Sequence, residues 1–218
     1  PVPVRQHTRW ILVALVILVT GLAYSNSLKN GFVNWDDDLY VYTNEDIRRL
    51  DGDSIREFFT GYFVKMYAPV TMISYALDYQ IGGLNAAVYH STNLILHLLN
   101  VALVFYLIFL LTGRTAIALI VSLFFGIHPL HVESVAWITE RKDLLYSFFY
   151  LSGLITYLHY CDRNRQRRYY IYTLILFALS LLSKSAAVTF PLALLLIDFY
   201  RGKKRTITES RPMTRAKT

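Results

Sequence analysis

Apolar residues along this chain fall into long, nearly uninterrupted stretches instead of short alternating patterns. Several stretches approach the roughly 20 residues that a helix needs to cross about 30 Å of hydrocarbon. The last two are short and meet around residues 183–185, which predicts a helical hairpin. The pattern as a whole predicts an all-α integral membrane protein, a multispan helical bundle with spans at residues 10–27, 88–111, 115–127, 144–160, 169–182 and 186–200.

Lysine and arginine residues set the expected orientation, because cytoplasmic loops carry an excess of them. Six crossings place the three basic clusters and the lone Arg114 on the same, cytoplasmic side. We therefore expect a cytoplasmic N-terminus (1–9), a membrane module (10–202) with an outer loop (28–65), and a basic cytoplasmic tail (203–218). The clusters are Arg5 and Arg9; Arg163, Arg165, Arg167 and Arg168; and Arg201, Lys203, Lys204 and Arg205.

Residues 66–83 form a further apolar segment, which contains Pro69 and Asp78. If it crossed the membrane, every later basic loop would change sides, so we interpret it as a re-entrant or juxtamembrane segment on the outer side. Ahead of it, residues 54–62 have the amphipathic pattern typical of a short helix lying on a membrane surface. Asp53 or Ser54 is the expected N-cap of that helix.

Composition excludes several protein classes. The 218 residues are 55% apolar and 17% charged, with a mean hydropathy of +0.36, whereas soluble domains carry about 25% charged residues. The single cysteine, Cys161, excludes a disulfide framework. No Walker or Gly-x-Gly-x-x-Gly motif supports nucleotide chemistry. We interpret the basic segments as anchors on anionic membrane lipid and not as nucleic-acid sites.

Three consecutive carboxylates, Asp36, Asp37 and Asp38, follow the first span. A carboxylate can take a proton from a hydroxyl nucleophile, and neighbouring carboxylates can raise its pKa toward neutrality. The same residues are candidate ligands for a divalent metal. The alternative is a solvated acidic loop that only marks the outer side.

A second polar group lies where the third span ends, at His128, His131 and Glu133. Pro129 breaks the helix there. Side chains three and five residues apart could share a metal or orient an acid, although the spacing matches no strong metal motif. The alternative is a span terminus whose polar groups satisfy frayed backbone.

Cations before the fourth span and inside the final hairpin are candidate phosphate ligands. Arg141 and Lys142, next to Asp143, could hold a phosphate by charge-assisted hydrogen bonds; an ordinary loop at headgroup level is the alternative. Lys184 has apolar residues on both sides, so its charge needs a partner, and an anionic ligand would serve.

The second span carries a polar stripe about 80° wide on a helical wheel. Such a stripe must face protein, and hydrogen bonds between helices are the favoured interpretation. His90, nearest the outer end, is the member we expect to support the site. The stripe comprises His90, Asn93, His97 and Asn100.

Four blocks of the sequence resemble a known family. They are GFVNWDDDLYVYTNEDI (31–47), a block beginning YAPVTMISYALDYQ (67–100), FFGIHPLHVESVAWITERKDLLYSFFYLSGLITYLHY (124–160) and LSLLSKSAAVTFPLALLLIDFY (179–200). In this order they resemble the membrane half of bacterial tetratricopeptide-linked type C glycosyltransferase-like proteins. Those proteins are related to the transmembrane-and-tetratricopeptide protein O-mannosyltransferases. The HPLHVESVAW-x-x-ERKD-x-L block is the most specific.

The resemblance implies a fold similar to the N-terminal module of the type C glycosyltransferases, in a bacterial inner membrane, with its site facing the periplasm. It implies a polyprenyl-phosphate-linked sugar as donor and a protein or glycan hydroxyl as acceptor. By position, the role of base or metal ligand falls on Asp36 or Asp37, with Asp38 in support. The expected donor pocket comprises Arg141, Lys142, Lys184, His128, His131, Glu133 and Tyr67, with His90 and Asp143 supporting.

Two departures keep a second function open. Ala68 stands between Tyr67 and Pro69, where the family usually has a basic residue. Family members also continue into further spans and a tetratricopeptide domain. The competing hypotheses are an inverting glycosyltransferase and a non-catalytic membrane subunit that binds partners or lipid. An ion carrier is disfavoured, because most of the polar groups lie at span ends and not at mid-membrane.

Overall fold

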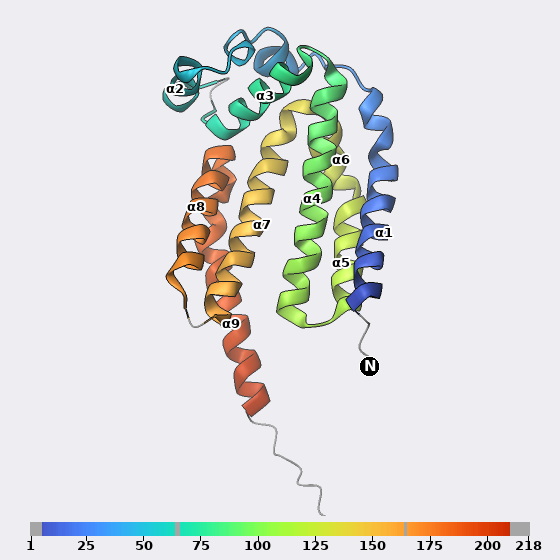
Figure 1. Cartoon of the computed structure of the whole chain (residues 1–218), viewed down its shortest axis with the longest axis vertical. Coiled ribbons are helices and arrows are strands. Elements are labelled where there is room, and N and C mark those ends of the chain that lie inside the picture. The colour runs from blue at the N-terminus through green and yellow to red at the C-terminus, as the bar shows by residue number, and fades with distance from the viewer. Residues whose placement is uncertain (1–5, 64–65, 164, 210–218) are drawn as a thin grey trace, which may run out of the picture. The chain divides into compact units, whose positions relative to one another are not determined.

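The computed structural model of the chain describes residues 6–63, 66–163 and 165–209, with side chains to residue 202 (Figure 1). The described residues are helical apart from turns and one isolated bridge between Phe63 and Met66. The chain divides into two units, residues 1–187 and 188–218. Arg5, the basic side chains at 203–205 and the end of the tail fall outside what is described.

Each predicted span is a helix. Three segments are long and apolar enough to cross a membrane: Gln6–Lys29, Ala86–Thr112 and Ser185–Gly202; Thr115–Ile127 with Pro129–Ala136, bent by 50°, is a fourth. The chain is an all-α membrane bundle, as its hydrophobic pattern predicts. The spans correspond to α1 (Gln6–Tyr24), α4 (Ala86–Thr112), α5 (Thr115–Ile127), α7 (Arg141–Asp162), α8 (Arg167–Ser183) and α9 (Phe190–Glu209).

Within the first unit, α4 is the central helix and packs against α1, α5 and α7, while α8 packs along α7 (Figure 1). The polar stripe of α4 points inward, as expected, because each of its four side chains is at most 1% exposed. His97 Nε2 lies 2.9 Å from the carbonyl of Gly126. A Cβ at Gly126 would lie 2.4 Å from Thr20 Oγ1, so only glycine permits this approach of α5 to α1.

One end of the bundle is covered by the outer loop, by α2 (Gly52–Thr60) and by α3 (Pro69–Gly82) (Figure 1). Pro69 occupies the first turn of α3, where its missing N–H costs nothing. Thr71 Oγ1 donates to the carbonyl of Ser183 at 3.1 Å, which ties the start of α3 to the end of α8. The segment at 66–83 therefore lies against the same end of the bundle as Lys184.

The N-cap of α2 differs from the prediction. Asp51, and not Asp53 or Ser54, caps the helix, because its Oδ1 accepts from Ser54 N at 2.8 Å and from Ser54 Oγ at 2.8 Å. These hydrogen bonds lower the pKa of the Asp51 carboxyl below its usual value. Both nearby candidates lie inside the first turn, so the local sequence alone did not separate them.

The orientation stays a prediction that thiol labelling would test. In a Cys161→Ser background, a membrane-impermeant maleimide added from outside is expected to label Asn34→Cys and to leave Arg114→Cys unlabelled. Asn34 is exposed in the outer loop, and Arg114 is exposed in the turn between α4 and α5. Labelling of position 114 but not 34 in intact cells would contradict the orientation.

Candidate functional site

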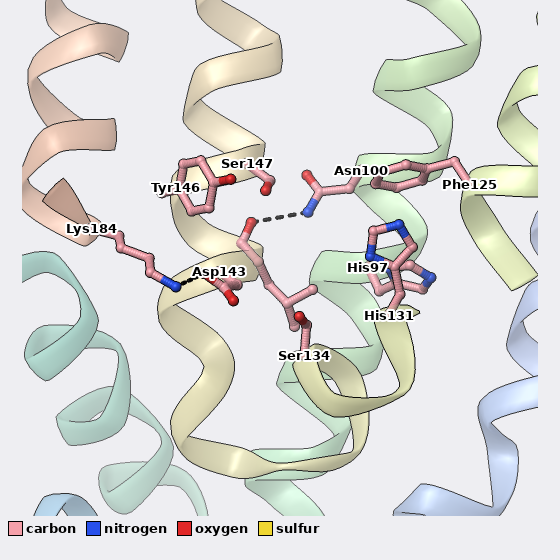
Figure 2. Close-up of a pocket in the computed structure, with 10 residues that line it drawn as sticks. His97, Asn100, Phe125, His131, Ser134, Asp143, Tyr146, Ser147 and Lys184 are labelled. Carbon is pink, nitrogen blue, oxygen red and sulfur yellow. Dashed lines mark hydrogen bonds and ion pairs between the residues drawn. The ribbon is translucent and has the colours of Figure 1, made fainter. Parts of the chain in front are cut away.

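A polar cavity of about 270 Å³ opens between α4, α6 (Val132–Ala136), α7 and the residue that follows α8 (Figure 2). All of its walls belong to the first unit of the chain. Two of the predicted site residues, His131 and Lys184, contribute directly, as does the supporting Asp143. The lining residues are His97, Asn100, Phe125, His131, Ser134, Asp143, Leu144, Tyr146, Ser147 and Lys184.

Lys184 and Asp143 form an ion pair at one side of the cavity (Figure 2). Lys184 follows the last turn of α8, and its Nζ lies 4.0 Å from Glu140 Oε2 as well. The two side chains of the pair are 25% and 26% exposed, so water reaches both charges. The partner that the sequence required for Lys184 is thus a carboxylate that an incoming anion could replace.

Asn100 gives the cavity a buried acceptor. Its Nδ2 donates to the carbonyl of Leu144 at 3.0 Å, but within the described residues its Oδ1 has no hydrogen-bond partner. A buried polar atom without a partner costs about 1–3 kcal/mol. The cavity is also lined by the hydroxyl-bearing side chains of Tyr146 and Ser147. A ligand hydroxyl would supply the missing hydrogen bond after a small movement of the Asn100 side chain, because Oδ1 is closed off from solvent.

The opposite wall is aromatic (Figure 2). The ring centroids of Phe125 and His131 lie 4.5 Å apart, and the centroid of the His97 ring lies 5.8 Å from each of them. The cavity therefore combines an aromatic wall with amide, hydroxyl and charged groups. Its lining is more polar than the largely apolar surface of a typical small-molecule pocket, which favours a polar ligand.

The three aspartates of the outer loop have different environments. Asp37 is 1% exposed, and its carboxylate accepts from Val33 N at 3.0 Å and Thr139 N at 3.1 Å, so it fastens the loop to the segment before α7. Asp38 Oδ1 accepts from Leu39 N. Asp36 is half-buried, and no described residue forms a hydrogen bond or ion pair with its carboxylate. Asp36 is therefore the member available to a substrate.

A run of interacting side chains extends from Tyr40, four residues after Asp36, to Lys184 at the cavity. Burial, followed by the negative charges of Asp36 and Glu140, raises the pKa of the Tyr40 hydroxyl to about 12. Lys142 Nζ lies 5.8 Å from the Tyr40 ring centroid and 3.0 Å from Glu140 Oε1. Glu140 Oε2 in turn lies 4.0 Å from Lys184 Nζ. Burial raises the pKa of the Glu140 carboxyl; the nearby Lys142 lowers this pKa and the nearby Asp143 raises it further.

Arg141 lies away from the cavity, in the protein interior. It is fully buried, and its NH1 forms an ion pair with Asp78 Oδ2 at 2.5 Å. Its other donors reach Asn93 Oδ1 at 2.8 Å and the carbonyl of Tyr89 at 2.8 Å. With its guanidinium held in this way and closed off from solvent, Arg141 fastens α3, α4 and α7 together and does not line the cavity.

Four other predicted residues also lie outside the cavity walls. His128 and Glu133 are exposed, and His128 Nδ1 accepts from Leu130 N at 3.2 Å. Tyr67 is 40% exposed and donates to the carbonyl of Phe59 at 3.1 Å. His90 is 1% exposed, with its Nε2 3.5 Å from the carbonyl of Gly31. Of the predicted group His128, His131 and Glu133, His131 is the member that lines the cavity.

The described residues do not fit the divalent metal considered for the acidic loop. Among them, no three His, Cys, Asp or Glu side chains converge closely enough to hold an ion. Asp37, the buried carboxylate, already accepts two backbone N–H groups. The acidic loop, as far as it is described, therefore lacks the ligand set of a divalent-metal site.

Similarity to curated proteins identifies the family. The chain is 32% identical over 163 residues to human protein O-mannosyl-transferase TMTC2, an alignment that covers 70% of this chain and 19% of that protein. It is 32% identical over 174 residues to Drosophila melanogaster Tmtc1, covering 76% and 20%. The chain belongs to a TMTC-related family. It spans 16–20% of the length of these relatives and of human TMTC3.

Membership in the TMTC-related family confirms the relation to the transmembrane-and-tetratricopeptide protein O-mannosyltransferases that the four sequence blocks indicated. No protein-family model matches the chain. No solved structure matches it either.

Several cavity residues of this TMTC-related chain escaped the sequence-based prediction. His97 and Asn100 belong to the polar stripe of α4, which we assigned to helix packing. Tyr146 and Ser147 follow Asp143 by three and four positions, so the three share one face of α7. Their spacing from Asp143 could therefore have identified Tyr146 and Ser147 as site residues. Glu140 stands beside the basic pair Arg141–Lys142 and could have been included on that ground.

Proposed function

We propose that this chain forms the donor site of a membrane glycosyltransferase that moves a sugar, mannose by relation to TMTC proteins, from a polyprenyl phosphate to a protein hydroxyl. The observation that carries the proposal is the cavity in which Lys184–Asp143 and the unpartnered Asn100 Oδ1 lie beside an aromatic wall. The expected setting is the outer face of a bacterial inner membrane.

The size and chemistry of the cavity suit the polar head of such a donor. Drug-sized ligand pockets measure about 300–1,000 Å³, and about 270 Å³ leaves room for a sugar and phosphate but not for a prenyl chain. The phosphate would take the place of Asp143 at Lys184 Nζ. Sugar hydroxyls would bond Asn100 Oδ1 and the Ser147 hydroxyl, and the sugar ring would pack against His131.

In the proposed reaction, Asp36 acts as general base. Its carboxylate takes the proton of the acceptor hydroxyl, and the acceptor oxygen attacks the anomeric carbon from the side opposite the phosphate. The bond from the anomeric carbon to the phosphate oxygen breaks, and the prenyl phosphate leaves with the electron pair. The configuration at the anomeric carbon is thereby inverted. Lys184 and Lys142 stabilise the negative charge that develops on the leaving group.

Lys184→Met tests the donor site. A charge-assisted hydrogen bond contributes about 1.5–3 kcal/mol, so the variant is expected to bind polyprenyl-phosphate mannose roughly 10- to 150-fold more weakly in nanodiscs. Transfer to a serine-containing peptide should fall at least as much. Lys29→Met, at an exposed lysine of the outer loop, is the matched control and should leave both unchanged. Equal binding by wild type and Lys184→Met would contradict the site.

A non-catalytic membrane subunit is the second candidate, favoured by Ala68. This residue is 7% exposed at the start of α3, one turn before the Thr71–Ser183 hydrogen bond, and offers no charge to a phosphate. If this function holds, the protein binds the donor or a partner but transfers no mannose to any hydroxyl acceptor.

A further inference from the structure

Arginines gather at the end of the first unit opposite the cavity. This end holds the start of α1, the turn between α4 and α5, and the turn between α7 and α8 (Figure 1). The segment 161–170 contains four arginines and one carboxylate, Asp162. The described arginines of this end are Arg9, Arg114, Arg163, Arg165, Arg167 and Arg168.

Two of these arginines share one aromatic ring. Arg163 Cζ lies 5.5 Å and Arg168 Cζ 5.0 Å from the centroid of the Tyr169 ring, both within cation–π range. Arg168 Nε also donates to Gln166 Oε1 at 3.0 Å, which limits the freedom of its side chain. Both arginines are exposed, so each guanidinium has N–H groups turned to solvent. Two like charges at one ring favour an anion that both can contact.

The surface next to this pair is apolar. On α8, Ile171, Leu174 and Ile175 are 42%, 47% and 51% exposed. Tyr170 and Tyr172, at 46% and 52%, mark the boundary between the charged and apolar regions, where tyrosine is enriched in membrane proteins. A ligand that fits both regions carries an anionic phosphate next to hydrocarbon. Free phosphate or a nucleic acid would use only the charged region.

We propose that Arg163, Arg168 and Tyr169 form a headgroup site for an anionic phospholipid whose acyl chains lie along the exposed apolar face of α8. The arginine pair holds the phosphate, and Tyr169 holds the arginines in position. This site lies at the opposite end of the bundle from the cavity and does not depend on the proposed transferase activity.

The test counts phospholipids that stay bound to the purified protein in native mass spectrometry, after exchange into phosphatidylglycerol, phosphatidylcholine or an equal mixture. Wild type should retain phosphatidylglycerol in preference to phosphatidylcholine. With about 1 kcal/mol for each arginine near a surface, Arg163→Gln with Arg168→Gln should weaken phosphatidylglycerol binding roughly 30-fold. The control is Arg49→Gln with Arg56→Gln, two exposed arginines in the outer loop and α2, at the opposite end of the bundle.

Three outcomes would overturn the site. One is retention of phosphatidylglycerol by the Arg163–Arg168 double variant, and another is equal loss in the control. The third is displacement of the lipid by millimolar inorganic phosphate, which would assign the arginines to a free anion. Tyr169→Leu, which removes the ring and no charge, should weaken phosphatidylglycerol binding several-fold; unchanged binding would refute the role of the ring. An unchanged melting temperature in neutral lipid shows that each variant is folded.

Discussion

Arg141→Met is expected to destabilise the bundle by about 3–5 kcal/mol, because breaking a buried ion pair leaves an uncompensated charge in the interior. The variant strips Asp78 of its ion-pair partner and Asn93 Oδ1 of its donor. Thermal unfolding in detergent, followed by tryptophan fluorescence or circular dichroism, should show a melting temperature lower by on the order of 10 °C.

The matched control removes both charges. Arg141→Met combined with Asp78→Leu should recover much of the loss, since apolar residues often replace a buried ion pair at little cost. A single variant that melts like wild type would contradict the structural role of Arg141. A single variant that melts normally and loses donor binding would return Arg141 to the phosphate site predicted from the sequence.

Asp36→Asn and Asp37→Asn are expected to fail in different ways. Loss of a general base lowers turnover by at least about 100-fold, so Asp36→Asn should lose transfer while keeping its melting temperature. Asp37→Asn replaces one oxygen that accepts a backbone N–H, and should lower stability by about 1–3 kcal/mol. The measurements are mannose transfer from a polyprenyl-phosphate donor and thermal unfolding.

Asp38→Asn is the control for this pair, because in the described structure the Asp38 carboxylate accepts only from the adjacent Leu39 N. It should change neither property by much. Full turnover in Asp36→Asn, in Asp37→Asn and in the double variant would refute the assignment of the base to this loop.

The sequence was sufficient for the helices and insufficient for the contacts between them. Of the six predicted spans, three are long and apolar enough to cross a membrane, and a bent pair of helices makes a fourth. Membrane helices require long apolar stretches, and residues 115–127 were predicted with the bounds that α5 has. The amphipathic segment at 54–62 was also a helix, although Asp51 supplies its cap. These features depend on neighbouring residues, so a linear pattern contains them.

The site depends on residues far apart in the sequence. Lys184 was predicted to need a partner because it is a cation between apolar residues, and Asp143 fills that need across 41 positions. Asp78 likewise lies within an apolar segment, so its charge needed a cation. No neighbouring residue in the sequence indicates that this cation is Arg141. Two basic neighbours, Arg141 and Lys142, therefore looked equivalent, and only packing separates the buried residue from the one near the cavity.

A structure determined with polyprenyl-phosphate mannose in nanodiscs would test the donor site most directly. We expect the donor phosphate within hydrogen-bond distance of Lys184 Nζ, the Lys184–Asp143 pair opened, and a sugar hydroxyl on Asn100 Oδ1. Donor density that bypasses the cavity, with the Lys184–Asp143 pair intact, would contradict the proposed site.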